Sequence, residues 1–153
     1  PDNVPGDVPY LAADPAKVAA WKQRLGDHGF KVGIIWQGKG ETVIQKSRSS
    51  PLSALLPLTK IDGVRLISLQ KDVYRDDGDV DIATLPIERL PDDFDTGPDA
   101  FGDTAAIMEN LDLVITIDSA VSHLAGGLGV PVWVALKKTP DWRWQIAETT
   151  SPW

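Results

Sequence analysis

The sequence predicts an α/β fold, a three-layer sandwich built on a mainly parallel sheet. Short apolar segments rich in β-branched residues alternate along the chain with segments of helical pattern, which is typical of a parallel sheet covered on both faces. A length of 153 residues is about that of one domain. The predicted central strands are residues 31–36, 64–69, 113–117 and 131–136.

The N-terminal half of the chain supplies a linker, two helices and two of these strands. Residues 1–14 are rich in Pro and Asp and are expected to form a linker to a domain that spans residues 15–153. Asp14 and Pro15 suit the N-cap and first position of a helix. Residues 51–60 are predicted to form a second helix, kinked at Pro57.

The C-terminal half supplies two further helices and a short strand near Ile87–Leu90. Asp103 is expected to cap a helix that runs through Leu111. Residues 119–128 are predicted to form the last helix, which Gly129 ends. Gly126 and Gly127 within it are expected to allow close packing of the helix on the sheet.

Charge and composition limit the possible partners. The net charge is −7 and the pI is near 4.7, which argues against a nucleic-acid surface. Residues 72–103 carry eleven Asp or Glu and only two Arg, and they are expected to form a solvated, loop-rich face. The sequence has no apolar run near the ~20 residues of a membrane span. It also lacks a signal peptide and cysteine, so the predicted location is cytoplasmic.

Ligands of parallel α/β sheets bind beyond the carboxyl ends of the strands. The segments expected to matter most are therefore residues 37–48, 70–72 and 118–123. In the last of these, Asp118 and Ser119 stand where an apolar strand gives way to a helix, whose first N–H groups and dipole favour an anion such as a diphosphate. His123, four residues after Ser119, would lie over the same turn. The alternative is that Asp118 and Ser119 only cap the helix and that His123 is a half-buried structural residue.

The other two segments offer polar and basic side chains. Gln37 and Gly38 follow the first strand, and Lys46 and Arg48 come later in the same segment, where they could neutralise an anionic ligand. The alternative is an ordinary mobile basic loop. Gln70 and Lys71 end the second strand and would face a base or ribose, or else only solvent.

Two classes of site are disfavoured. His28 and His123 lie far apart in the sequence and there is no cysteine, so the usual metal-ligand spacings are absent and no bound metal is expected. No Gly-x-Gly-x-x-Gly follows the first strand, which argues against a nicotinamide-binding domain. No cofactor is expected.

The motifs IDSAVSHLAGGLGVPVWVAL, ISLQKD and IWQGKG…KSRSSPL resemble the C-terminal domain of heptosyltransferase-like enzymes, glycosyltransferase family nine. The resemblance is strongest to the bacterial branch in which tetratricopeptide repeats precede the glycosyltransferase region. It implies one Rossmann-like half of a GT-B fold, the half that binds a nucleotide-diphosphate sugar. The chain would then be a fragment of a larger enzyme, with the N-terminal half and the repeats as its partners.

The resemblance also implies roles for single residues. Ser119, Ala120 and Val121 would offer backbone amides to the diphosphate, which His123 would approach. Asp118 would contact the donor sugar or hold the turn. The remaining implied contacts are Gln70 and Lys71 near the nucleoside, and Lys46 or Arg48 against the leaving diphosphate in place of a metal.

The expected function is therefore donor binding in a glycosyltransferase whose acceptor and donor sugar the sequence does not define. The catalytic base is expected on the N-terminal half, so the fragment alone would be inactive. Two alternatives remain open: a GT-B-like sugar-nucleotide epimerase or hydrolase, and a non-catalytic binding module attached to helical repeats.

Overall fold

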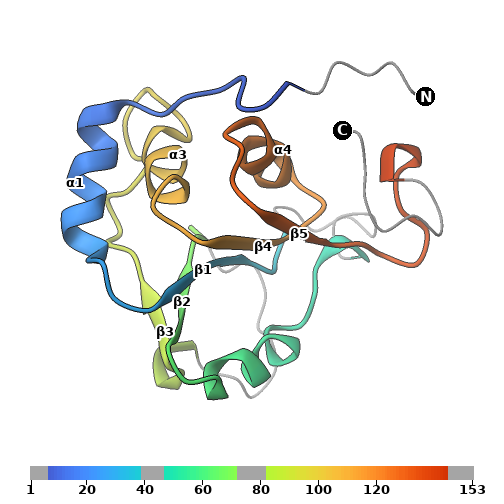
Figure 1. Ribbon diagram of the computed structural model, residues 1–153. Coiled ribbons are helices and arrows are strands. Elements are labelled where there is room, and N and C mark those ends of the chain that lie inside the picture. The colour runs from blue at the N-terminus through green and yellow to red at the C-terminus, as the bar shows by residue number, and fades with distance from the viewer. Residues whose placement is uncertain (1–6, 39–46, 72–81, 145–153) are drawn as a thin grey trace.

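The computed structural model describes residues 7–38, 47–71 and 82–144, which form a five-stranded, all-parallel sheet with the strand order β3-β2-β1-β4-β5 (Figure 1). The sheet confirms the predicted α/β class and has a Rossmann-like arrangement. Its strands are β1 (Phe30–Ile35), β2 (Val64–Ser68), β3 (Ile87–Arg89), β4 (Leu113–Ile117) and β5 (Val132–Ala135).

All four predicted central strands are present, but one of them is not central. β5 pairs with β4 alone among the described strands and forms an edge of the sheet. Its residues alternate between half-buried and exposed, and Trp133 is 64% exposed. The apolar character of this segment suggested an interior strand, but only one of its faces is substantially covered.

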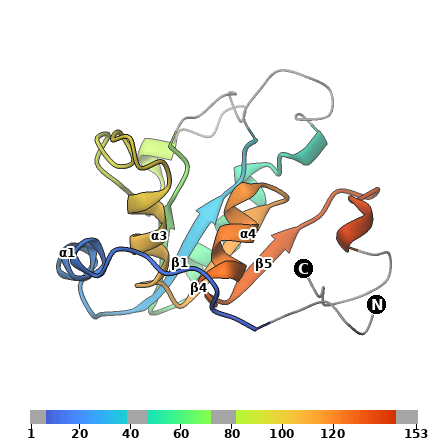
Figure 2. The ribbon, with the colours of Figure 1, turned by 90° about the horizontal axis from the view of Figure 1, so that it is seen from above.

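Helices cover the two faces of the sheet unequally. α1 (Pro15–Leu25), α3 (Gly102–Met108) and α4 (Ala120–Gly127) lie on one face, and the short 3-10 helices η1 (Leu52–Ala54) and η2 (Leu56–Lys60) lie on the other (Figures 1 and 2). Each face has its own apolar core. The larger core, under the three α-helices, includes Trp21, Leu25, Ile107, Met108, Val114 and Val121. The smaller one includes Val32, Ile34, Trp36, Leu52 and Leu66.

Two helix predictions need correction. Residues 51–60 form two successive 3-10 helices and not one kinked helix, because Pro57 has no N–H to donate and disfavours the α conformation at Leu56. Asp103 lies in the first turn of α3 and is not its N-cap, which is Phe101 in a left-handed conformation. The first amides of α3 are satisfied by Asp95, whose Oδ1 accepts hydrogen bonds from the N–H groups of Asp103 (2.7 Å) and Thr104 (3.3 Å).

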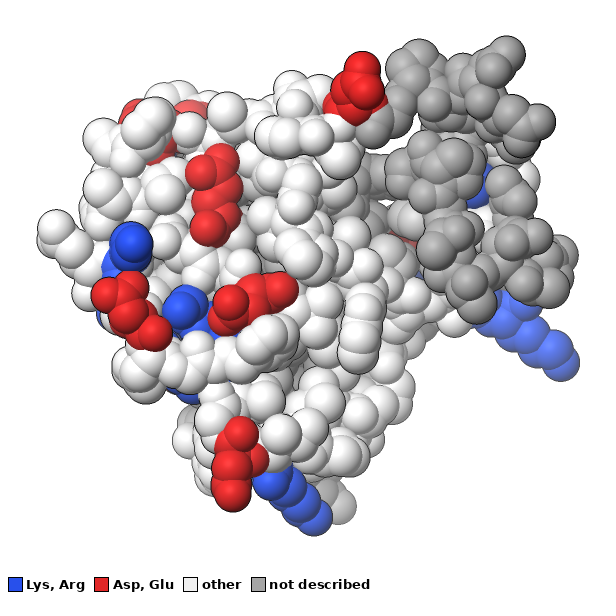
Figure 3. Space-filling view, in the orientation of Figure 1, with Lys and Arg blue, Asp and Glu red and all other residues white. Residues whose placement is uncertain are grey.

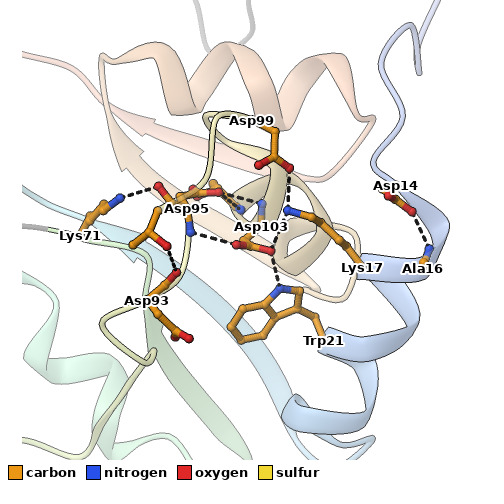
Figure 4. A network of polar contacts seen from close by, with 11 residues as sticks. Asp14, Ala16, Lys17, Trp21, Lys71, Asp93, Asp95, Asp99 and Asp103 are labelled. Carbon is orange, nitrogen blue, oxygen red and sulfur yellow. Dashed lines mark hydrogen bonds and ion pairs between the residues drawn. The ribbon is translucent and has the colours of Figure 1, made fainter.

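Asp103 instead joins the loop before α3 to α1 (Figure 4). Its carboxylate accepts hydrogen bonds from the Asp95 N–H at 2.9 Å and from Trp21 Nε1 at 3.3 Å. Lys17 Nζ lies 3.2 Å from the same carboxylate and 2.7 Å from that of Asp99. Several acidic residues expected on a solvated face are therefore structural, and Figure 3 shows acidic and basic side chains interspersed over this side of the molecule.

The described part of the expected linker packs against α4. The N–H groups of Tyr10 and Leu11 both donate to the Gly127 carbonyl at 2.9 Å. A Cβ on Gly127 would lie 2.7 Å from Leu11 Cδ1, whereas a Cβ on Gly126 would meet nothing within 4 Å. Gly127 thus makes room for the N-terminal segment and not for the sheet, contrary to expectation. No helix among the described residues is both long enough and apolar enough to cross a membrane.

We expect Gly33→Ala to lower the free energy of unfolding by about 1–3 kcal/mol, the usual cost of overpacking a core. A Cβ on Gly33 would lie 2.5 Å from Leu111 Cδ1 and 2.9 Å from Leu69 Cδ1, and both leucines are buried. Gly126→Ala is the matched control and should raise stability by up to about 1 kcal/mol, because it adds a better helix former in open space. Urea unfolding measures both, and equal stabilities for the two variants would contradict the close packing at β1.

We also expect stability to fall in acid partly through Asp103. Burial alone raises its pKa, but hydrogen bonds from the Asp95 N–H, Trp21 and Lys17, together with the charge of Lys17, hold this pKa below its usual value. Its stabilising effect is therefore complete above the usual pKa of about 4 and is lost as the pH falls through the lowered value. Urea unfolding from pH 7 to pH 2 should show a shallower pH dependence for Asp103→Asn than for the wild type or for the exposed control Asp62→Asn.

Candidate ligand-binding site at the carboxyl edge of the sheet

The strand order reverses at β1. Strands β2 and β3 follow on one side of β1, and β4 and β5 follow on the other. In open α/β sheets the crevice beyond the carboxyl ends of the two strands at such a reversal is where ligands bind. Here these strands are β1 and β4, which pair directly along Val32–Ile35 and Leu113–Thr116. The segments that follow them contain Gln37, Gly38 and Arg48 after β1 and Asp118 and Ser119 after β4.

The turn after β4 leads straight into α4. Ser119 occupies the N-cap position in an extended conformation, but its side chain makes no capping hydrogen bond. The hydroxyl instead lies 3.5 Å from Thr116 Oγ1, and the Ser119 carbonyl accepts the hydroxyl of Ser122 at 2.7 Å. Ala120 is exposed, whereas Val121 points into the larger core. The hydroxyl of Ser119 therefore does not cover the first N–H groups of α4.

Arg48 reaches this turn from the segment that follows β1. Its Nε lies 4.0 Å from Asp118 Oδ2, within ion-pair range but too far for a hydrogen bond. The Nε atom is buried and has no hydrogen-bond partner among the described residues, although the side chain as a whole is 32% exposed. A buried donor of a charged group without an acceptor is costly, so this position favours an added oxyanion. Lys46, the other basic candidate, lies outside the described residues.

Other polar groups hold the end of β1. The Gln37 N–H donates to Gln70 Oε1 at 3.0 Å, and the Gly38 N–H donates to Ser49 Oγ at 3.2 Å. Both amides are thus satisfied within the protein, and Gln37 is only 3% exposed. The side-chain oxygen of Gln70 thus fixes the chain that leaves β1, and the contact of Gln70 with a nucleoside stays a prediction. Ser49 was not anticipated, because nothing in the sequence shows that the chain returns past Gly38.

Lys71 turns away from the end of β1. Its Nζ donates to the Asp95 carbonyl at 2.6 Å and lies 5.9 Å from the centre of the Phe94 ring. Both contacts belong to the loop that precedes α3, and Figure 4 shows the hydrogen bond from Lys71 to Asp95. The described contacts therefore give Lys71 a structural role in that loop.

His123 lies on the exposed side of α4 and stacks on Trp144. The ring centroids are 5.6 Å apart and the rings are inclined by 23°. Trp144 ends η4 (Trp142–Trp144) and is only 9% exposed. The sequence interpretation overlooked η4, although the segment after β5 must also begin at the carboxyl edge of a parallel sheet.

A turn before Trp144 carries a second carboxylate. Asp141 Oδ1 accepts hydrogen bonds from the Arg143 N–H at 3.1 Å and from Arg143 Nη1 at 2.7 Å, and its carbonyl accepts the Trp144 N–H at 3.0 Å. The hydrogen bond from the Arg143 N–H is the main cause of a lowered pKa of Asp141. Burial opposes this shift, and the Arg143 side chain and the charge of Arg48 reinforce it. The Asp141 carboxylate is therefore held chiefly by Arg143.

Within residues 7–38, 47–71 and 82–144, no group of three or more His, Cys, Asp or Glu side chains is arranged to hold a metal ion. Since this finding concerns only the described residues, the absence of a bound metal stays a prediction. The structure brings Arg48 together with Asp118, next to Ser119 at the start of α4.

Fold and site together define a Rossmann-like parallel α/β domain with a polar site at its topological switch point. No protein-family model matches the chain. No solved structure matches it either. The chain is 30% identical over 148 residues to Protein FlbA of the bacterium Caulobacter vibrioides. The alignment covers 94% of this chain but only 24% of FlbA, so the chain spans about a quarter of the length of this relative.

We expect Ser119→Ala to change the stability of the fold very little, by less than about 0.5 kcal/mol. Its hydroxyl makes no capping bond, unlike the Asp14 carboxylate, which accepts the Ala16 N–H at 2.8 Å at the start of α1. Asp14→Ala is therefore the matched cap deletion and should cost about 0.5–2 kcal/mol. Thermal unfolding compares the two variants, and an equal loss for Ser119→Ala would show that Ser119 is an ordinary helix cap.

Proposed function

We propose that this chain is the donor-binding domain of a GT-B-type glycosyltransferase, which moves a sugar from a nucleotide-diphosphate sugar to an acceptor. The observation that carries the proposal is the convergence of Arg48 and Asp118 beside the start of α4, at the switch point between β1 and β4. The resemblance of IDSAVSHLAGGLGVPVWVAL to the heptosyltransferase-like family supports the same assignment.

The chemistry fits the groups present. Glycosyl transfer through an oxocarbenium-like transition state leaves negative charge on the departing nucleoside diphosphate. The dipole and main-chain N–H groups at the start of α4, together with the Arg48 guanidinium, would stabilise that charge. Asp118, 14% exposed, would contact the sugar or hold Arg48 in place.

The proposal extends to partners that lie outside this chain. In a GT-B enzyme the active site lies between two halves, and the other half would supply the acceptor site and the base. We therefore expect this chain alone to bind a nucleoside diphosphate without transferring sugar. Tetratricopeptide repeats in the full-length protein are part of the same proposal.

A GT-B-like sugar-nucleotide epimerase or hydrolase is the second candidate. Such chemistry needs acidic groups near the sugar, and Asp118, 4.0 Å from Arg48 Nε, would be one of them. Incubating the chain with nucleotide-diphosphate sugars separates the two proposals. Steady release of free nucleoside diphosphate, or inversion of the sugar, would favour this candidate over the transferase.

The test is calorimetry of the chain against adenosine, guanosine, cytidine and uridine diphosphates, with the matching nucleosides as controls. We expect one diphosphate to bind and Arg48→Ala to weaken it by roughly ten- to a hundredfold, the effect of losing a hydrogen bond to a charged group. His123→Ala should weaken it to a smaller degree, since the Trp144 ring already covers one face of the imidazole. Binding of the nucleosides should be nearly unchanged in both variants.

Two further variants separate ligand binding from folding. Ser119→Pro removes a main-chain donor at the turn and should cost the most affinity, while Ser119→Ala should cost little. Melting temperatures of the same proteins serve as the control. If stability falls and diphosphate affinity holds in both Arg48→Ala and Ser119→Pro, the diphosphate site is wrong.

A further inference from the structure

A cavity of about 310 Å³ lies between α1 and the loop that precedes α3. Its volume is at the lower end of the range in which proteins bind small molecules. Lys17, Trp21 and Arg24 line the cavity from α1, and Asp93, Phe94 and Asp103 line it from the loop and the start of α3. Figure 4 shows Lys17 and Trp21 reaching from α1 toward this loop. None of these residues belongs to the proposed diphosphate site.

The two aromatic residues form an apolar wall of the cavity. Trp21 and Phe94 are only 5% and 6% exposed, and both belong to the larger core. The indole N–H of Trp21 donates to Asp103 at 3.3 Å, and the Phe94 N–H donates to the Pro91 carbonyl at 3.2 Å. The wall is therefore formed by packing and hydrogen bonds that do not involve a ligand.

Two of the four charged residues in the cavity already have partners. Lys17 Nζ lies 2.7 Å from the Asp99 carboxylate and 3.2 Å from that of Asp103. The Asp103 carboxylate also accepts the Asp95 N–H at 2.9 Å. These two charges are neutralised within the protein, so they offer little to a ligand.

The other two charged residues, Arg24 and Asp93, are exposed and carry opposite charges. Among the described residues neither side chain has a hydrogen-bond or ion-pair partner, and the two do not pair with each other although they line the same cavity. The Arg24 guanidinium carbon lies 4.9 Å from the centre of the Trp21 ring, a stacked arrangement that leaves its N–H groups available to an acceptor. The cavity therefore offers one cation, one anion and an apolar wall.

We propose that this cavity binds a small zwitterion, an α-amino acid with an apolar side chain. The Arg24 guanidinium donates to the ligand carboxylate, the Asp93 carboxylate accepts from the ligand ammonium, and the apolar side chain packs on Trp21 and Phe94. A ligand with both charges is favoured because a singly charged one leaves either Arg24 or Asp93 without a partner. This site goes beyond the proposed glycosyl transfer and does not depend on it.

Calorimetry with three probes that share one apolar side chain tests the requirement for both charges. L-leucine carries both charges, isocaproate lacks the ammonium, and isoamylamine lacks the carboxylate. We expect L-leucine to bind about tenfold more tightly than either of the others, the effect of one added hydrogen bond to a charged group. Equal affinities for the three probes would overturn the proposal, as would the failure of both L-leucine and L-phenylalanine to bind at millimolar concentration.

Two variants test the assignment of the charges to Arg24 and Asp93. Arg24→Gln should abolish the preference for L-leucine over isoamylamine, and Asp93→Asn should abolish the preference over isocaproate. The matched controls are Lys22→Gln, on the same helix, and Asp92→Asn, next to Asp93. Both controls change exposed residues that do not line the cavity, so both preferences should remain. Preferences that survive in Arg24→Gln and Asp93→Asn would overturn the assigned contacts.

The indole N–H of Trp21 locates the bound probe. In proton–nitrogen NMR spectra its signal, assigned with Trp21→Phe, should shift when L-leucine is added, because the ring lines the cavity. The signal of Trp133, an exposed residue on β5, is the control and should stay unchanged. A shift of the Trp133 signal without a shift of the Trp21 signal would place the probe elsewhere and overturn the proposed site.

Discussion

The pairing of β1 with both β2 and β4 is the constraint on which the rest of the structure depends. It puts the reversal of strand order at the centre of the sheet, so that the chain leaving β1 and the chain leaving β4 emerge side by side. Two apolar cores, one on each face, hold β1 in that position. The approach of Arg48 to Asp118, two residues 70 positions apart in the sequence, follows from this adjacency.

The acidic character of the chain has two different structural consequences. Around α1 and α3, Asp95, Asp99 and Asp103 accept hydrogen bonds from backbone amides, Trp21 and Lys17, and they tie a loop to two helices. At the carboxyl edge of the sheet, Asp118 lies 4.0 Å from Arg48 and Asp141 pairs with Arg143. In an acidic protein, each cationic side chain that could bind an anionic ligand is also attracted by nearby carboxylates of the protein itself.

The similarity to FlbA and the strand order bear on different questions. The strand order defines the fold, and it predicts that a ligand binds beyond the carboxyl ends of β1 and β4. The similarity extends along nearly the whole chain but reaches only a quarter of FlbA, so it concerns one part of a longer relative.

The sequence by itself determined the class of fold, the four main strands and the cap at Asp14. These features depend on local patterns of apolar and polar residues, which periodicity reveals. Tertiary structure decided that Asp95 satisfies the amides of α3, that Gln70 and Ser49 satisfy those after β1, and that Trp144 stacks on His123. The Gln70 and Trp144 contacts join residues from separate elements, and the Asp95 contacts join residues eight or nine positions apart across an irregular loop. The spacing of residues along the chain therefore does not predict them.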